Sequence, residues 1–365
     1  MYIHQLKQWP GFTWDYQALS SKLSHIRHRQ GKVLGQMNMM GFILKEEALL
    51  QTLTLDVVKS SEIEGEVLNT DQVRSSIAKH LGIAIGGLKP VSRHIEGVVE
   101  LMLDATQKYN ETLTKDRLYN WHGSLFPTGR SGLAKIQVGK WRTGIKGPMQ
   151  VISGAAGRER VHFEAPDAQV VDEEMSVFLD WFEEKQSIDP VLKAAIAHLW
   201  FVTIHPFDDG NGRITRAITD MQLARADHTE QRFYSMSAQI QKERSAYYHM
   251  LEVTQKGNLD ITGWLNWFLD CLDRSMDSTD ETLQKINQRN RFWEMQRNTP
   301  FNTRQQKMLD ILLGDFYGKL NVSKWAKMTG CSTDTALRDI QDLIAKGVLV
   351  KDDAGGRSTG YLLKG

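Results

Sequence analysis

Twelve consecutive residues in the second half of the chain combine a base, carboxylates and two guanidinium groups. The run reads His205-Pro206-Phe207-Asp208-Asp209-Gly210-Asn211-Gly212-Arg213-Ile214-Thr215-Arg216. The imidazole of His205 has an unperturbed pKa of about 6.5, which suits general-base work near neutral pH. The carboxylate of Asp209 could hold a magnesium ion that bridges phosphate oxygens. Together these side chains favour chemistry on a polyphosphate.

Two predicted helices position this run. Leu192 to Ile204 is strongly apolar and predicts a buried helix, and helical spacing of apolar residues resumes after the run. The first turn of the second helix has unpaired N–H groups and a partial positive charge, which favour anions. Gly210 and Gly212 let the backbone approach a phosphate closely. Arg213 and Arg216 are three residues apart, so both side chains can reach one polyphosphate.

Each of these features alone has an ordinary structural explanation. A His-Pro pair at a helix end is usually a stop signal, and a Gly-Asn-Gly run is usually a turn. Arginines at helical spacing usually form a solvated face. The combination, in this order and beside a buried helix, favours a catalytic site.

The run resembles the Fic motif, HxFx(D/E)GNGRxxR, at every specified position. The resemblance implies an all-helical core that transfers a nucleotide, usually AMP from ATP, to a Ser, Thr or Tyr hydroxyl. It implies that His205 deprotonates the target hydroxyl and that Asp209 binds Mg²⁺. Three residues would cradle the α- and β-phosphates: Gly210, Asn211 and Gly212. Arg213 would hold the β-phosphate and Arg216 the γ-phosphate.

A second motif lies upstream, at Ser60-Ser61-Glu62-Ile63-Glu64-Gly65. It resembles the Fic inhibitory motif, (S/T)xxxE(G/N), whose helix lies beside the ATP site and whose glutamate pairs with the second arginine. Here that pair would be Glu64 and Arg216. A carboxylate in the guanidinium fork would remove the γ-phosphate anchor and repel phosphate. The alternative is a surface glutamate in a capping-like sequence.

Short β-prone runs at Met149 to Ile152 and Val161 to Phe163, between glycines, predict a β-hairpin. It resembles the Fic flap, which docks the target as an added strand through main-chain pairing. We count four flap residues with the nucleotide and target site: Val151, Ile152, Ser153 and Gly154. An ordinary surface hairpin is the alternative.

Tyr247 and Tyr248 precede Leu251 at helical spacing. In the Fic family a tyrosine pair at this distance after the motif contacts the base and ribose, so we count both as ATP-binding. An aromatic pair on a helix is more often plain core. Some relatives have Asn where this chain has Gln255, which puts that one contact in question.

The last part of the chain is a separate unit. Its sequence predicts three helices and a hairpin, the order of a winged helix: Thr303 to Leu313, Val322 to Met328, Thr333 to Lys346, then Val348 to Lys351 and Tyr361 to Leu363 around a Gly355-Gly356 turn. The predicted fold is therefore mainly α, a helical Fic core with a hairpin flap plus a C-terminal winged helix. The predicted parts are 1–90 with the inhibitory helix, the core at 91–272, a helical connector at 273–300 and the winged helix at 301–365.

Charge limits what the C-terminal unit binds. Residues 301–365 contain ten Lys or Arg and seven Asp or Glu, a weak basic footprint for a DNA-binding domain. The predicted recognition helix offers Thr335 and Arg338 but also Asp334 and Asp339. This favours a weak or partner-dependent DNA binder, or a protein-interaction role.

Other functions stay open at this point. The chain could be a transcription regulator whose Fic core senses nucleotide, although an intact His205 favours an enzyme. The same site could also transfer another nucleotide or remove AMP. The family's members commonly form small dimers, so a homodimer is one state that the resemblance allows.

Composition points to a cytoplasmic protein. The formal net charge is +1, so no global field draws the chain to nucleic acid or membrane. Cys271 and Cys331 are far apart and predict no disulfide framework. Met1 to Trp9 lacks the apolar run of a signal peptide, and no stretch approaches the roughly 20 apolar residues of a membrane helix.

Overall fold

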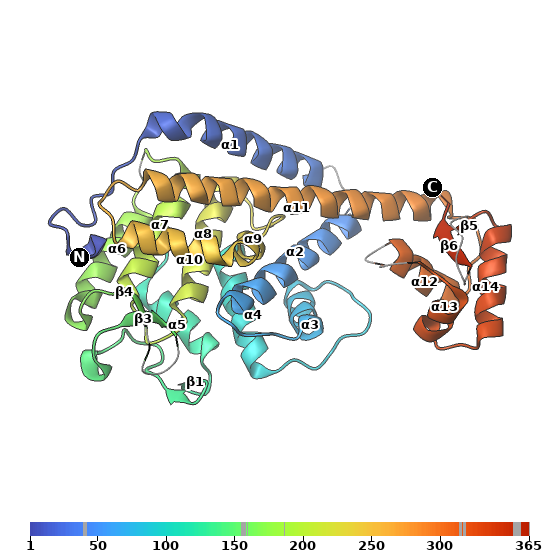
Figure 1. The fold of residues 1–365 in the computed structure, drawn as a ribbon, viewed down its shortest axis with the longest axis horizontal. Helices are drawn as coiled ribbons and strands as arrows, with labels where there is room; N and C mark the ends of the chain where they lie inside the picture. Colours follow the sequence, from blue (N-terminus) through green and yellow to red (C-terminus); the bar gives the residue numbers. More distant parts are fainter. Residues whose placement is uncertain are drawn as a thin grey trace. The chain divides into compact units, whose positions relative to one another are not determined.

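The computed structural model describes residues 1–38, 42–154, 158, 160–185, 187–313, 316, 319–352 and 359–364. The chain divides into two compact units, Met1–Thr279 and Asp280–Gly365 (Figure 1). Both are dominated by helices, and the described strands form short two-stranded sheets. The predicted mainly α fold is confirmed.

The first unit contains the helices from α1 to the first part of α11, which continues past Thr279. In chain order they are α1 (Tyr16–Asn38), α2 (Phe42–Ile63), α3 (Thr70–Leu81), α4 (Arg93–Gln107), α5 (Lys115–Leu125), α6 (Val171–Glu183), α7 (Pro190–Ile204), α8 (Asn211–Asp227), α9 (Met236–Lys242), α10 (Arg244–Gln255) and α11 (Thr262–Met295). The 3₁₀ turns described in this unit are η1 (Ile3–Gln5), η2 (Gly144–Lys146) and η3 (Ala168–Val170).

Helix α7 forms the centre of the core. Every residue from Val191 to Ile204 is buried. A helix that is apolar on all sides has to lie inside the protein, which explains this position. Its start is fixed by Pro190 in the first turn and by Asp189, whose side chain accepts a hydrogen bond from the N–H of Val191 at 2.8 Å. The predicted buried helix is confirmed, and His205 lies at its C-terminal end.

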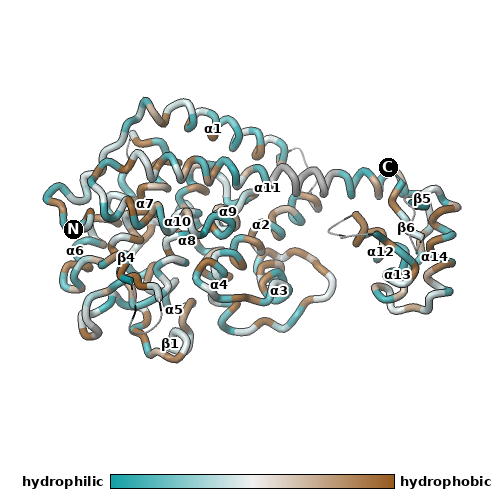
Figure 2. The backbone as a smooth tube through the Cα atoms, in the orientation of Figure 1, coloured by the Kyte–Doolittle hydropathy of each residue, from teal (hydrophilic) through white to brown (hydrophobic). Residues whose placement is uncertain are grey.

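Helix α1 covers the beginning of α11 (Figure 1). Hydrophilic and hydrophobic segments alternate along α1, as Figure 2 shows. The buried side recurs every three or four residues, which is the pattern of an amphipathic helix: Leu19, Leu23, Ile26, Gln30, Val33 and Met37. Arg29 joins the two helices through an ion pair with Asp273 at 2.8 Å.

The segment before α1 packs on the core. The rings of Trp9 and Phe12 lie 6.2 and 5.7 Å from that of Trp200 on α7. The N–H of Thr13 donates to the carbonyl of Leu259 at 2.8 Å. The segment therefore has a packing role in the first unit.

In the described part of the stretch between α5 and α6, two hairpins are present. The predicted hairpin is formed by β3 (Gln150–Ser153) and β4 (Arg160–Glu164), which pair antiparallel. A second hairpin, β1 (Arg130–Ser131) with β2 (Ala134–Lys135), was not predicted. Two-residue strands are too short to show a period-two pattern in sequence.

The second unit follows the predicted order of elements. It contains α12 (Thr303–Leu313), α13 (Val322–Thr329), α14 (Thr333–Ala345), β5 (Leu349–Asp352) and β6 (Gly360–Leu363). Trp325, Met308 and Ile340 are buried in its hydrophobic core. The predicted connector at 273–300 is largely helical because α11 continues to Met295. The predicted Gly355-Gly356 turn lies outside the described residues.

None of the helices in the described ranges combines the length and the apolar character that a membrane-spanning segment requires.

Candidate functional site

His205 ends α7 in an unusual backbone conformation. Its φ and ψ are 52° and 57°, the left-handed region that residues other than glycine adopt rarely. Arg142 fixes this turn with two hydrogen bonds. Its side-chain Nε donates to the carbonyl of His205 at 2.8 Å, and its backbone N–H donates to the carbonyl of Pro206 at 2.8 Å. The strained turn is therefore fixed by tertiary hydrogen bonds.

The hydrogen bonds of His205 define which ring nitrogen can act as a base. Nδ1 lies 3.1 Å from the carbonyl oxygen of Val202. A carbonyl only accepts, so Nδ1 carries the proton and the lone pair of Nε2 can accept one. Burial lowers the pKa of His205, while the contact with Val202 opposes that shift. The neutral, proton-accepting form is therefore favoured near pH 7.

Asn211 closes the loop rather than reaching towards a ligand. Its Oδ1 accepts from the N–H of Phe207 at 2.9 Å, and its Nδ2 donates to the carbonyl of Phe207 at 2.9 Å. The side-chain amide is thus used inside the loop. Gly210 has a φ of 80°, and a Cβ there would lie 2.8 Å from Cε2 of Phe126, so this turn requires glycine.

The first turn of α8 and two arginines form a positively charged cradle. In any α-helix the first N–H groups have no partner within the helix, and here they belong to the residues from Asn211 onward. Arg213 and Arg216 are buried, and the Arg213 guanidinium lies 5.1 Å from the ring centroid of Phe126. Among the described residues no acceptor bonds the buried Nε of Arg213. Such a site fits an anion.

Glu64 occupies this cradle. Its Oε1 forms an ion pair with Nη1 of Arg216 at 2.8 Å. Ser60 holds the rest of the guanidinium, accepting from Nε at 2.9 Å and, through its carbonyl, from Nη2 at 2.7 Å. A Cβ at Gly212 would lie 2.0 Å from Glu64 Oε1, so the carboxylate rests directly on the first turn of α8. The structure brings the two predicted partners together.

Glu66 makes an equivalent contact that the sequence reasoning missed. Its Oε2 lies 2.9 Å from Nη1 of Arg213, and its Oε1 contacts Nε2 of His94 on α4. The hydrogen bond from His94 lowers the pKa of Glu66, burial opposes this, and the charge of Arg213 lowers it further. The available signal was a second carboxylate two residues after Glu64.

Asp209 is held by donors on three sides. Its Oδ1 accepts from the N–H of Gly210 at 2.6 Å, and its Oδ2 accepts from the hydroxyl of Ser131 on the β1–β2 hairpin. The backbone carbonyl of Asp209 contacts Nε2 of His122 at 3.1 Å. A carboxylate beside a phosphate cradle, with lone pairs still available, fits a magnesium ion whose other ligands are phosphates and water.

His122 is a further supporting residue that the sequence did not indicate. The N–H of Gly139 donates to its Nδ1 at 3.1 Å, so Nε2 carries the proton and donates to Asp209. Its ring stacks on Phe207 with centroids 4.2 Å apart. Burial lowers the pKa of His122 to about 4, with contacts to Asp209 opposing the shift. A neutral imidazole thus supports the loop.

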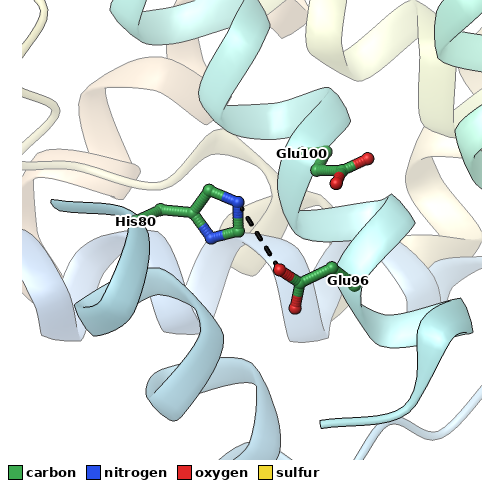
Figure 3. A group of neighbouring side chains, drawn as sticks. All are labelled: His80, Glu96 and Glu100. Carbon is green, nitrogen blue, oxygen red and sulfur yellow. Dashed lines mark ion pairs between the residues drawn. The ribbon is translucent and has the colours of Figure 1, made fainter.

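Among the residues that the structure describes, one other group could hold a metal ion by its donor types. His80, Glu96 and Glu100 on α3 and α4 bring their ligand atoms within 4.8 Å of one another (Figure 3). Nε2 of His80 and Oε1 of Glu96 are 3.5 Å apart, and the hydroxyl of Ser76 donates to Glu96 at 2.8 Å. His80 and Glu100 are exposed, and we interpret the group as a surface ion pair.

The tyrosine pair lies on the arginine side of the site. Tyr247 is buried, and its hydroxyl contacts Nε2 of His198 at 2.9 Å. The hydroxyl of Tyr248 donates to the carbonyl of Ile63 at 3.3 Å, immediately before Glu64. Gln255 is buried and donates to Thr203 at 3.2 Å, so its amide is used in the core.

The four predicted flap residues lie at the end of β3. Val151, Ile152 and Ser153 belong to the strand, and Gly154 follows it with a φ of 107°. Ile152 is 54% exposed. In its two-stranded sheet β3 pairs with β4 on one side.

Two family models match separate parts of the chain. Residues 112–223 match the Fic/DOC family. Residues 2–83 match a domain of unknown function, DUF4172. Glu64 and Glu66 therefore lie in one matched region and the arginines that they contact lie in the other.

The chain is similar to curated proteins named protein adenylyltransferase Fic. One from Culex quinquefasciatus is 29% identical over 72% of this chain and 53% of its own length. One from Aedes aegypti is 31% identical over 64% of this chain and 42% of its own length. The chain thus spans about half the length of these relatives or less.

Solved structures share the fold. A Fic family protein from Desulfovibrio desulfuricans aligns with a TM-score of 0.52 at 20% identity, covering 94% of this chain and 96% of that one. A Fic domain-containing signaling protein from Bacteroides thetaiotaomicron aligns with a TM-score of 0.53 at 19% identity, covering 72% and 97%.

Proposed function

We propose, on the premise that residues 112–223 match the Fic/DOC family, that the chain transfers AMP from ATP to Ser, Thr or Tyr hydroxyls of proteins. One observation carries the proposal. The proton-accepting Nε2 of His205 lies in the short loop before a helix amino terminus whose first turns carry two buried arginines. A base next to a polyphosphate cradle is the arrangement that nucleotidyl transfer to an alcohol requires.

Each residue of the site has its own role in the proposed reaction. His205 takes the proton from the acceptor hydroxyl, whose oxygen forms a bond to the α-phosphorus while the bond to pyrophosphate breaks on the opposite side. The first N–H groups of α8, with Arg213 and Arg216, hold and neutralise the phosphates. Asp209 holds Mg²⁺, which when bound neutralises phosphate charge.

Glu64 is proposed to inhibit this activity. Its carboxylate contacts Arg216 and lies against Gly212, where the triphosphate would bind. Two like charges at one guanidinium repel each other, so ATP has to displace Glu64. The Ser60 contacts hold Arg216 ready in the same position.

The hairpin β3–β4 is proposed to dock the target protein. An extended segment pairing with β3 would use main-chain hydrogen bonds that tolerate many sequences. The exposed Ile152 offers an apolar contact for such a strand. We propose cytoplasmic action, since neither Cys271 nor Cys331 is in a disulfide.

A DNA or protein partner of the C-terminal unit stays a prediction. Asp339 forms an ion pair with Arg304 at 2.8 Å, and the Asp339 side chain is largely buried. That carboxylate is therefore neutralised within the unit, and Arg338 beside it is exposed. Asp339 would therefore repel DNA phosphates less than the sequence alone indicated. A homodimer likewise stays a prediction.

The test is labelling by ATP carrying its label at the α-phosphate, with Mg²⁺, in the Glu64→Gly background. We expect covalent label on protein, and no label when His205→Ala is added. Label from γ-labelled ATP instead would identify a kinase and contradict the proposal. Persistent α-label after His205→Ala would remove the base assigned here.

A further inference from the structure

His198 is a fully buried, ionisable residue in the middle of α7. A buried polar ring needs hydrogen-bond partners, because it has lost those that water would supply. Its Nδ1 lies 2.9 Å from Oγ1 of Thr219 on α8, and its Nε2 lies 2.9 Å from the hydroxyl of Tyr247 on α10. The ring of His198 therefore links α7 to the helix that carries both arginines and to the helix that carries the tyrosine pair.

The hydroxyl of Thr219 decides which nitrogen of His198 carries the proton. Oγ1 of Thr219 donates to the carbonyl oxygen of Thr215, one turn earlier on α8, at 2.8 Å. A hydroxyl has a single proton, so towards His198 the oxygen of Thr219 can only accept. Nδ1 of His198 is therefore the protonated nitrogen.

Burial keeps this ring neutral. Burial, with the positive charge of Arg216 adding to it, lowers the pKa of His198 to about 3. A neutral imidazole carries one N–H, which here is on Nδ1, so Nε2 accepts. The hydroxyl of Tyr247 therefore donates its proton to Nε2 of His198.

The oxygen of Tyr247 can then only accept from its other neighbours. Burial raises the pKa of Tyr247, and Arg216 opposes this rise through its charge and through a side-chain hydrogen bond. Because the hydrogen of the Tyr247 hydroxyl points to His198, the negative end of the O–H dipole is left to face the guanidinium. Thr219, His198 and Tyr247 thus form a directed chain of hydrogen bonds that ends at Arg216.

Arg216 has partners on two sides. Ser60 accepts from Nε and Nη2, and Glu64 pairs with Nη1. Glu64 has to leave when ATP binds in the proposed reaction. His198 and Tyr247 belong to α7 and α10, so their contact with the guanidinium does not require Glu64 to be in place.

We propose that His198 is a positioning residue of the nucleotide site, which orients the Tyr247 hydroxyl so that its oxygen holds Arg216 in place for the γ-phosphate. The inference rests on the proposed function, which assigns Arg216 to that phosphate. His198 acts only through Tyr247. Its loss therefore affects a nucleotide with three phosphates and spares one with two.

The main test compares ATP with ADP, because the two differ in the γ-phosphate alone. Both affinities are measured by calorimetry with Mg²⁺ on the full-length chain with Glu64→Gly and His205→Ala, which removes the proposed base. Adding His198→Leu should weaken ATP binding by about tenfold, since a hydrogen bond to a charged group is disturbed, and should leave ADP binding unchanged. His198→Gln, whose amide oxygen can replace Nε2 as the acceptor, should restore ATP binding.

Two further variants separate positioning from a general loss of structure. Tyr247→Phe should cause the same selective loss of ATP binding, and His198→Leu added to it should cause no further loss. Thr106→Val is the matched control, because it removes a fully buried hydroxyl that donates to the carbonyl of Met102 on α4 at 2.8 Å. It should bind ATP as its parent does. If His198→Leu does not fold, Tyr247→Phe and the ring spectrum decide.

The ring spectrum needs no nucleotide. Long-range proton–nitrogen NMR spectra of His198 at pH 7 should show a proton on Nδ1 and none on Nε2. A proton on Nε2, or ATP affinity unchanged by either His198→Leu or Tyr247→Phe, would overturn the inference. Equal losses for ATP and ADP would also overturn it. These outcomes leave the proposed transfer of AMP standing, whereas absence of α-label on the Glu64→Gly chain would overturn that function and not the tautomer.

Discussion

The Glu66 carboxylate lies 2.9 Å from Arg213, in the same cradle where Glu64 lies 2.8 Å from Arg216. Two glutamates separated by one glycine thus pair with both arginines of the motif. The proposed inhibition has two parts, because release of one pair leaves the other guanidinium neutralised. His94 strengthens the second part by holding the far oxygen of Glu66.

Removing Glu64 should activate the chain. In Glu64→Gly the guanidinium of Arg216 keeps its bonds to Ser60 but loses the competing carboxylate. We expect the rate of AMP incorporation to rise about tenfold or more, since tenfold corresponds to about 1.4 kcal/mol. Initial rates with α-labelled ATP measure this, and a rate unchanged from the parent would contradict inhibition by Glu64.

Removing Glu66 should add to that effect. Glu66→Gln keeps the side chain's size but removes the charge opposite Arg213, so ATP meets less repulsion. We expect the double variant with Glu64→Gly to have a lower KM for ATP than Glu64→Gly alone. Glu62→Gln is the matched control, because Glu62 pairs with Lys59 at 2.6 Å. Equal KM values for the two double variants would show that Glu66 is irrelevant to ATP binding.

The acid limb of the pH–rate profile should have its midpoint at a low pH, below 6.5. Burial lowers the pKa of His205 from its usual 6.5. The base works in its neutral form, so activity is retained as the pH falls through 6.5 and is lost only when His205 is protonated. We expect the half-maximal point of kcat/KM for ATP in Glu64→Gly below pH 6.5. A midpoint above 6.5 would show a His205 that is more basic than free imidazole.

His122 should make the stability depend on pH. The folded chain keeps this ring neutral to about pH 4, whereas the unfolded chain protonates it near 6.5. Between these values the unfolded state binds more protons, so the free energy of unfolding falls as the pH falls. The loss from this group is about 3 kcal/mol at 1.36 kcal/mol per unit of pKa.

Urea unfolding of the parent and of His122→Asn at pH 7 and pH 4.5 isolates that contribution. Both chains contain the other buried histidines, so the difference in pH dependence belongs to His122. We expect the parent to lose more stability on acidification than the variant. Parallel losses in both chains would rule out a neutral, buried His122 as the cause.

The parts of the site that sequence could predict are local. The motif from His205 to Arg216 is continuous, and the apolar run before it predicts α7 and therefore where the loop lies. The pairing of Glu64 with Arg216 was predictable because both residues belong to motifs with a known relation. The hairpin was located to within about one residue at each strand.

The missed residues depend on contacts between distant segments. His122 lies 87 residues before Asp209, and Ser131 lies 78 residues before it. Nothing in their own neighbourhoods marks them, since each acts through the tertiary position of another element. A bulge at His162, where Val151 pairs with Phe163 and Ile152 with Val161, was equally hard to predict. An extra residue in a strand changes the pairing without changing the type of residue.

The spacing of the two carboxylates has a consequence for which nucleotides the resting chain admits. If Arg213 serves the β-phosphate and Arg216 the γ-phosphate, AMP enters without disturbing either ion pair, ADP has to break one and ATP has to break both. The loop from Glu64 to Glu66 would then weaken nucleotide binding with each phosphate added beyond the first. The unmodified chain would bind AMP more tightly than ADP and ADP more tightly than ATP, even though ATP is its proposed substrate.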